Sequence, residues 1–254
     1  MTARILVSND DGIAAKGLRA LVDAVSPLAE VWVVAPETEQ SATSHALSLH
    51  KPLRIRKHAE RWFGVDGTPA DCVYLAVHHL MKGAQPTLVL SGINHGGNLA
   101  EDVIYSGTVA AAMEGSLLGF PSIAFSLVTR KTLEFEHAAR FAHALVKTAL
   151  GAKLPAQMLL NVNVPSNGAP VGYQITRLGR HLYEAGVVEK EDPRGRRYYW
   201  IGGSGYEHVS IPGSDCNAVH ESKCVSVTPL MLNLTDDGFF EPLASWQVEG
   251  FTRG

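Results

Sequence analysis

Short continuous apolar runs alternate along the chain with stretches whose apolar residues recur at helical spacing. Residues 4–8 form a run typical of a buried strand, and residues 16–25 follow with the periodicity of an amphipathic helix. A second apolar run covers residues 30–36, which gives the order strand, helix, strand. Near-continuous apolar strands joined through helices indicate a parallel sheet that is covered on both faces.

The same alternation continues to about residue 165. Thr68 is a candidate N-cap, Pro69 stands at the first helical position, and Asp71 is placed close to a capping box. The helix that they open is expected to end near Lys82. The remaining predicted elements are strands at residues 87–91, 122–126 and 158–164 and helices at residues 108–118 and 134–150. This pattern predicts an α/β class fold with a Rossmann-like, doubly wound and mostly parallel sheet, in which ligands bind beyond the carboxyl ends of the strands.

The alternation stops after residue 165. A turn signal at residues 192–195 lies between strand-like flanks and predicts a protruding β-hairpin. Three arginines within residues 194–197 stand beside three aromatic residues at 198–200, which is one form that a nucleic-acid patch takes. A solvated or subunit-contacting hairpin fits better, because few charges are involved and the whole chain is acidic.

Composition and charge narrow the class of protein. The 254 residues are 46% hydrophobic and 19% charged, which is typical of a globular chain. The net charge of -3 gives no general attraction to nucleic acid or to an anionic membrane. The three cysteines, Cys72, Cys216 and Cys224, lack metal-ligand spacing, and their odd number argues against a disulfide framework. No signal-peptide pattern or membrane-length apolar run occurs, so we expect a soluble, cytoplasmic protein that acts on a small molecule.

Oxygen-bearing side chains follow several of the predicted strands. Asp10 and Asp11 come after the first strand, Ser41 after the second, and Asn94 after the strand at residues 87–91. If the sheet is parallel, these side chains meet at one edge, and oxygen ligands suit a hard divalent cation better than structural zinc. The alternative is turn chemistry: Asp-Asp-Gly is a common turn, Ser41 can form a local hydroxyl turn, and the same tripeptide at residues 236–238 follows no such strand.

Two further stretches have the chemistry of an anion site. Residues 91–98 contain three glycines and two asparagines, which favours close approach of the backbone to a ligand. Ser106, Gly107 and Thr108 stand at a predicted helix start, where unpaired N–H groups attract phosphate. The alternative is that Ser106 or Thr108 only caps the helix. Neither stretch matches a P-loop or a dinucleotide-binding fingerprint.

Other catalytic arrangements have weaker support. His45, His95 and His220 stand in polar surroundings, but no histidine is assigned as a metal ligand. The chain has no G-x-S-x-G segment, so a serine hydrolase is not indicated. The adjacent positions of Asp10 and Asp11 also differ from the Asp-x-Asp spacing of enzymes that form an aspartyl-phosphate, since neighbouring side chains in an extended segment diverge.

Five segments, in the same order, resemble the survival protein E (SurE) family of metal-dependent nucleotidases. They read ILVSNDDGI, VVAPETEQSATSHALSLHKPL, VDGTPADCVYLA, LVLSGINHGGNLAEDVIYSGTVAAAMEG and CVSVTPL, at residues 5–13, 33–53, 65–76, 88–115 and 224–230. Gly97 stands where the family commonly has proline, and every proposed metal position is retained.

The resemblance implies a phosphohydrolase that acts on nucleoside 5′-monophosphates, often also on 3′-monophosphates and in some members on short polyphosphate. It implies one divalent cation, such as Mg²⁺ or Mn²⁺, per subunit. The implied metal ligands are Asp10, Asp11, Ser41 and Asn94, with Asp10 and Asp11 also catalytic, and the implied phosphate-side residues are Asn9, Asn98, Ser106, Gly107 and Thr108. The expected reaction is in-line attack by a water that the metal orients, with Asn98 and the Ser106 region stabilising charge on the phosphate.

The resemblance also implies an organisation of the chain. Residues 1–254 form a single domain, with a Rossmann-like core at 1–165 and a hairpin and C-terminal arm at 166–254. The arm is exchanged between subunits, which implies a homodimer or a homotetramer. The alternative from another class is a nucleotide-binding regulatory module that has the pocket but no turnover.

Overall fold

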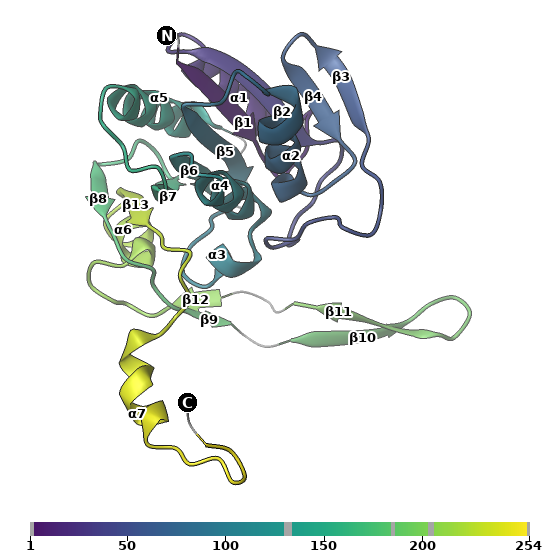
Figure 1. Cartoon of the computed structure of the whole chain (residues 1–254), viewed down its shortest axis with the longest axis vertical. Coiled ribbons are helices and arrows are strands. Elements are labelled where there is room, and N and C mark those ends of the chain that lie inside the picture. The colour runs from purple at the N-terminus through teal and green to yellow at the C-terminus, as the bar shows by residue number, and fades with distance from the viewer. Residues whose placement is uncertain (1–2, 130–133, 184–185, 203–205, 253–254) are drawn as a thin grey trace.

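A mostly parallel sheet runs through the molecule and is covered by helices on both faces (Figure 1). The computed structural model describes residues 3–129, 134–183, 186–202 and 206–252. In this part of the chain the sheet has nine strands in the order β3-β4-β2-β1-β5-β6-β7-β13-β8. The strands are β1 (Arg4–Ser8), β2 (Glu30–Pro36), β3 (Ile55–Ala59), β4 (Trp62–Val65), β5 (Leu88–His95), β6 (Ser122–Val128), β7 (Leu159–Pro165), β8 (Tyr173–Ile175) and β13 (Val225–Pro229).

Two apolar cores lie on the two faces of this sheet. Ile5 and Val7 of β1 pack into one core, and Leu6, between them in sequence, packs into the other, as alternation along a strand requires. The first core lies beneath α1 (Lys16–Val25) and α5 (Glu136–Leu150). The second lies beneath α2 (Pro69–Leu75), the π-helical turn η1 (Ala76–Leu80) and α4 (Gly107–Leu117). The predicted α/β fold with a doubly wound sheet is therefore confirmed.

Local sequence signals explain the starts of α2 and α4. Thr68 caps α2 by accepting from the Asp71 N–H, and the Asp71 side chain accepts from the Thr68 N–H, which is the predicted capping box. Ser106 caps α4 by accepting from the Val109 N–H at 3.1 Å. The short helix α3 (Asp102–Tyr105) precedes α4 and was not predicted.

Strand β5 differs from its prediction at a point that concerns the site. The strand does not end at Ser91 but continues to His95, with a register shift against β6 between Ser91 and Asn94. Asn94 therefore lies within the end of the strand and not in a following loop, which corrects the expected placement. The antiparallel pair β3 and β4 at one edge was also missed: β3 is polar and largely exposed, and β4 is apolar but only four residues long.

The segment after residue 165 contributes to the sheet as well as to its projections. Strand β13 pairs antiparallel with β7, and helix α6 (Asp215–His220) packs beside them. The predicted hairpin is present as β10 (Val187–Glu191) and β11 (Arg197–Ile201), reached through the pair β9 (His181–Tyr183) and β12 (Tyr206–His208).

The end of the described chain extends away from the sheet (Figure 1). It includes a 3₁₀ turn at Asp237–Phe239 (η2) and α7 (Phe240–Ala244). Asp236 caps this turn by accepting from the Gly238 N–H at 3.0 Å, so the second Asp-Asp-Gly has a turn role.

Cys72, Cys216 and Cys224 are buried free thiols. Within the described residues, no helix is long and apolar enough to cross a bilayer.

Candidate active site

A polar pocket of about 360 Å³ opens at the carboxyl ends of the central strands. Strand β1 lies between β2 and β5, and the chain leaves it toward β2 on one side and returns on the other with β5. Such a reversal of strand order is where open α/β sheets bind ligands. The lining residues are Asp10, Asp11, Glu39, Ser41, Ala42, Asn94, His95, Gly97, Asn98, Asp102, Tyr105 and Ser106.

The loop after β1 is a tight turn that presents its two carboxylates to this pocket. Gly12 has a φ of +96°, a conformation that side chains rarely adopt, and its carbonyl accepts from Asn9 Nδ2 at 2.9 Å. The Ile13 N–H donates to the Pro36 carbonyl at 2.7 Å, which fixes the turn against the end of β2. Asn9 is fully buried and does not line the pocket, so its contact acts on the shape of the loop.

Asp10 is only 5% exposed and lies against the start of α4. The Thr108 hydroxyl donates a hydrogen bond to Asp10 Oδ1. Burial, together with the neighbouring charge of Asp11, raises the pKa of Asp10 to about 6, although the Thr108 contact opposes the rise. A Cβ added to Gly107 would approach Asp10 Cβ to 2.8 Å, so this close approach of helix and carboxylate requires glycine.

The other three predicted metal ligands surround the same pocket. The Asp11 carboxylate accepts from the His95 N–H at 3.3 Å, and burial raises the pKa of Asp11 above its ordinary value. The Ser41 hydroxyl is exposed and donates to Glu39 Oε1 at 2.7 Å. Asn94 donates from Nδ2 to the Gly96 carbonyl at 2.9 Å, a contact that uses only the nitrogen of its amide. Three separate segments thus bring the four oxygen ligands to one pocket.

The charge of the pocket favours a cation. Four carboxylates line it, from Asp10, Asp11, Glu39 and Asp102, and no lysine or arginine stands among the lining residues that the structure describes. Carboxylate, hydroxyl and amide oxygens fit a hard divalent cation. Among the described residues, no three histidine, cysteine or acidic side chains are grouped so that they could hold a metal ion on their own.

The predicted phosphate-side residues divide into two groups. Asn98 and Ser106 line the pocket, and both are largely buried. Gly107 and Thr108 form the first turn of α4 behind them, where backbone N–H groups have no acceptor within the helix. Ser106 caps the helix and also lines the pocket.

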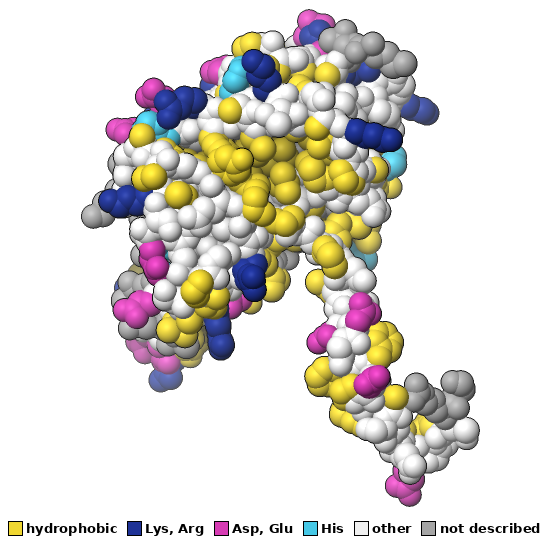
Figure 2. All heavy atoms as spheres, turned by 90° about the vertical axis from the view of Figure 1, so that its left-hand side faces the viewer, with side chains coloured by type: hydrophobic (Ala, Val, Ile, Leu, Met, Phe, Trp, Pro, Cys, Tyr) yellow, Lys and Arg dark blue, Asp and Glu magenta, His cyan; other side chains and the backbone are white. Residues whose placement is uncertain are grey.

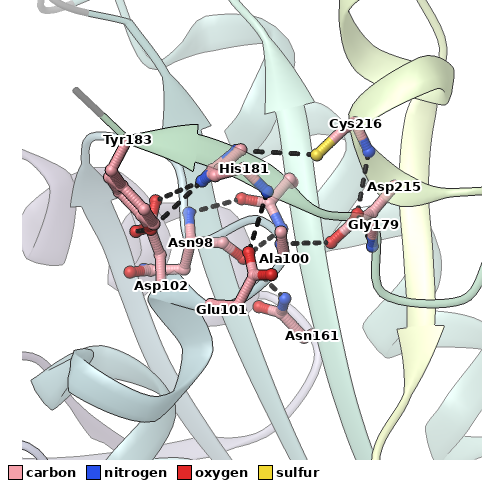
Figure 3. Close-up of polar contacts among 11 residues, drawn as sticks. Asn98, Ala100, Glu101, Asp102, Asn161, Gly179, His181, Tyr183, Asp215 and Cys216 are labelled. Carbon is pink, nitrogen blue, oxygen red and sulfur yellow. Dashed lines mark hydrogen bonds and ion pairs between the residues drawn. The ribbon is translucent and has the colours of Figure 1, made fainter. Parts of the chain in front are cut away.

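Four lining residues were not singled out from the sequence: Glu39, Ala42, Asp102 and Tyr105. The Tyr183 hydroxyl donates to Asp102 Oδ1, and His181 Nδ1 lies 3.5 Å from Asp102 Oδ2 (Figure 3). These contacts join the pocket wall to strand β9, at the base of the hairpin. The sequence did offer one signal for Asp102: its carboxylate stands in the short segment between residues 91–98 and the start of α4.

The candidate histidines have different surroundings. His95 lines the pocket, whereas His45 Nε2 lies 2.7 Å from Glu114 Oε2 on α4. His220 stacks on His208, with ring centroids 5.0 Å apart, and is not among the pocket residues.

Comparison with known proteins gives consistent matches over nearly the whole chain. The family described as "Survival protein SurE" matches residues 5–185. "5'-nucleotidase SurE" of Myxococcus xanthus (strain DK1622) is 66% identical over 250 residues, which cover 98% of this chain and 95% of that protein. "5'-nucleotidase SurE" of Vibrio cholerae serotype O1 is 47% identical over 248 residues, with 97% and 98% covered. The crystal structure of the SurE protein from Aquifex aeolicus superposes with a TM-score of 0.83 at 41% identity, over 94% of this chain and 98% of that one.

Proposed function

The chain belongs to the survival protein SurE family, and from this premise we propose that it is a divalent-metal-dependent 5′-nucleotidase. It is a phosphohydrolase that releases phosphate from nucleoside 5′-monophosphates. Three oxygen-bearing segments and a helix N-terminus meet at one pocket, which is the strongest support for this activity. Relatives that cover nearly the full chain bear the name 5'-nucleotidase SurE.

The proposed metal ligands are Asp10, Asp11, Ser41 and Asn94. When bound, the cation supplies positive charge to a phosphate oxygen and lowers the pKa of the attacking water. The two aspartates hold the cation and offset its charge. Burial is the main cause of the raised pKa of Asp10, and the charge of Asp11 adds to it. Asp10 or Asp11 accepts the proton of the attacking water.

The proposed phosphate side consists of Asn98, Ser106, Gly107 and Thr108, with Asn9 holding the loop of the two aspartates. The Ser106 hydroxyl accepts from the Val109 N–H and keeps its own hydrogen for a phosphate oxygen. The first amides of α4 point their N–H groups out of the helix, where they favour an anion. Donors fixed in this way stabilise the charge on the phosphate during in-line attack.

The proposal extends to further substrates and to assembly. We include nucleoside 3′-monophosphates and short polyphosphate as substrates, and a second copy of the chain as the partner. The described hairpin and arm carry exposed apolar side chains at Val187, Trp200, Ile201, Leu234, Phe240, Trp246 and Phe251. Such side chains favour burial against another chain, which supports a homodimer or homotetramer formed by residues 166–254.

One assay tests the activity and separates it from a regulatory binding module. Purified protein is incubated with a panel of nucleoside 5′- and 3′-monophosphates, with Mn²⁺ or Mg²⁺ and with a chelator, and released phosphate is measured. We expect release that depends on the metal and stops with the chelator. Nucleotide binding without chelator-sensitive release would favour the regulatory module and reject the nucleotidase.

A further inference from the structure

Two buried asparagines of β7 hold the main chain of Asn98. Asn163 Oδ1 accepts from the Asn98 N–H at 2.8 Å, and Asn163 Nδ2 donates to the Asn98 carbonyl at 3.0 Å. Asn161 Nδ2 donates to the same carbonyl at 2.8 Å (Figure 3). Both asparagines are fully buried, and the alternation of β7 places them on one face. The main-chain N–H and carbonyl of Asn98 thus make three hydrogen bonds with two side chains: the N–H donates one and the carbonyl accepts two.

The rest of this loop is held by neighbouring elements. Asn98 Nδ2 donates to the Ser126 hydroxyl of β6 at 2.8 Å, which uses one of its two hydrogens. The Ala100 N–H donates to Asp215 Oδ2 at 3.0 Å, and Asp215 Oδ1 accepts from the Gly179 N–H at 2.7 Å (Figure 3). The loop is therefore held at Asn98 and at Ala100. Among the described residues the second amide hydrogen of Asn98 has no acceptor, so it remains for the pocket.

Stability alone does not explain two amides at these positions. A buried amide loses its contacts with water, and a pair of apolar side chains of the same shape can be as stable as a hydrogen-bonded polar pair. Asn161 Oδ1 is buried without a hydrogen-bond partner in the described chain, so this residue carries an added desolvation penalty. The asparagines fix the position of the Asn98 main chain through hydrogen bonds, which apolar residues cannot do.

We propose that Asn161 and Asn163 are positioning residues that set the Asn98 side chain at the phosphate side of the pocket. This inference rests on the proposed function, because it takes Asn98 to be a phosphate donor. Hydrogen bonds to a phosphate weaken steeply with misplacement, so loss of the support behind Asn98 lowers phosphate affinity without removing any group that contacts phosphate.

The test measures binding of inorganic phosphate to the Mn²⁺-loaded full chain by titration calorimetry. Asn163→Ala removes two contacts with Asn98 and is expected to weaken phosphate binding about tenfold, whereas Asn161→Ala removes one and weakens it about threefold. The matched control is Ser226→Ala on β13, because Ser226 is fully buried, pairs in register with Asn163 and has no hydrogen-bond partner in the described residues. Its phosphate affinity is expected to equal that of the wild type.

A double-mutant cycle separates positioning from general stability. In an Asn98→Ala background, Asn163→Ala is expected to weaken phosphate binding by less than about twofold, because the group that it positions is absent. Unchanged affinity in Asn163→Ala, or an equal loss with and without Asn98, overturns the proposal. If Asn163→Ala does not fold, the same cycle is run with Asn161→Ala, and no change of affinity there also overturns it.

The binding measurement is independent of turnover. If the wild-type chain binds phosphate but releases none from nucleotides, the proposed function is rejected. The double-mutant cycle then still decides whether Asn161 and Asn163 position Asn98. Absence of phosphate binding in the wild-type, Mn²⁺-loaded chain overturns the positioning proposal, because Asn98 then has no phosphate to contact.

Discussion

The two copies of Asp-Asp-Gly show how surroundings decide the role of a residue. Asp10 and Asp11 follow a central strand and line a pocket, whereas Asp236 caps an exposed turn.

We expect Asp10→Ala and Asp11→Ala each to lower phosphate release by a factor of about 10² to 10³ or more at saturating Mn²⁺, since each removes a ligand of the cation. Asp237→Ala in the exposed copy is the control and should retain wild-type turnover. Wild-type turnover in both Asp10→Ala and Asp11→Ala would show that the metal site is assigned to the wrong residues.

Burial of Asp10 predicts a stability that depends on pH in the metal-free protein. Its pKa rises from the ordinary 3.8 to about 6 on folding, so the folded state binds the proton more tightly than the unfolded state. Stability from this group is present below pH 3.8 and is lost as the pH rises toward 6. Above that pH the ionised carboxylate destabilises the metal-free fold by up to about 3 kcal/mol.

Asp10→Asn tests this directly, because it removes the charge and keeps an acceptor for the Thr108 hydroxyl. With chelator at pH 8, we expect the variant to unfold at higher urea concentration than the wild type. Near pH 4 the difference should disappear. Added Mn²⁺ should stabilise the wild type and not the variant. An equal difference at both pH values would contradict the predicted titration.

At the scale of elements, the long loop between β2 and β3 carries Ser41 and is held against the helices. His45 Nε2 lies 2.7 Å from the buried Glu114 of α4, and the Ser44 hydroxyl donates to the Ile104 carbonyl at 2.7 Å. We expect His45→Ala to raise the Mn²⁺ concentration needed for half-maximal activity by about tenfold, because Ser41 loses its support. His50→Ala, at an exposed position of the same loop, is the control. Metal activation unaltered by His45→Ala would show that the contact does not position Ser41.

The elements also show what the sequence alone predicts. Strand runs, the α2 capping box and the hairpin turn depend on neighbours a few residues apart, and periodicity and turn chemistry predicted them. The placement of Asn94 within β5 and the contacts of Asn161 and Asn163 with Asn98 were not predicted. They depend on partners more than 60 residues away or on strand register. Asp102 was also missed: its position just before the α4 start was a local signal, but its hydrogen-bond partner Tyr183 lies 81 residues further along.

At the scale of the whole molecule, the pocket and the projections come from different parts of the chain. Every lining residue of the described pocket lies between Asp10 and Ser106. The arm after Leu232 makes little contact with its own body, and Figure 2 shows apolar side chains along it. Leu234 is 94% exposed and Phe251 is 80% exposed, which is unfavourable for an isolated chain in water.

Removal of residues 234–254 is therefore expected to reduce assembly and to leave the chemistry of each pocket in place. Light scattering after gel filtration should give fewer subunits per particle for the truncated chain than for the full chain. Mn²⁺ binding per chain should be retained, because Asp10, Asp11, Ser41 and Asn94 are untouched. Glu241→Ala, which changes an exposed polar residue of the arm, is the control and should keep the full mass. A truncated chain with the mass of the intact assembly would mean that the hairpin alone, or another surface, joins the subunits. Loss of Mn²⁺ binding on truncation would instead mean that the arm supports the pocket, because no ligand of the cation has been removed.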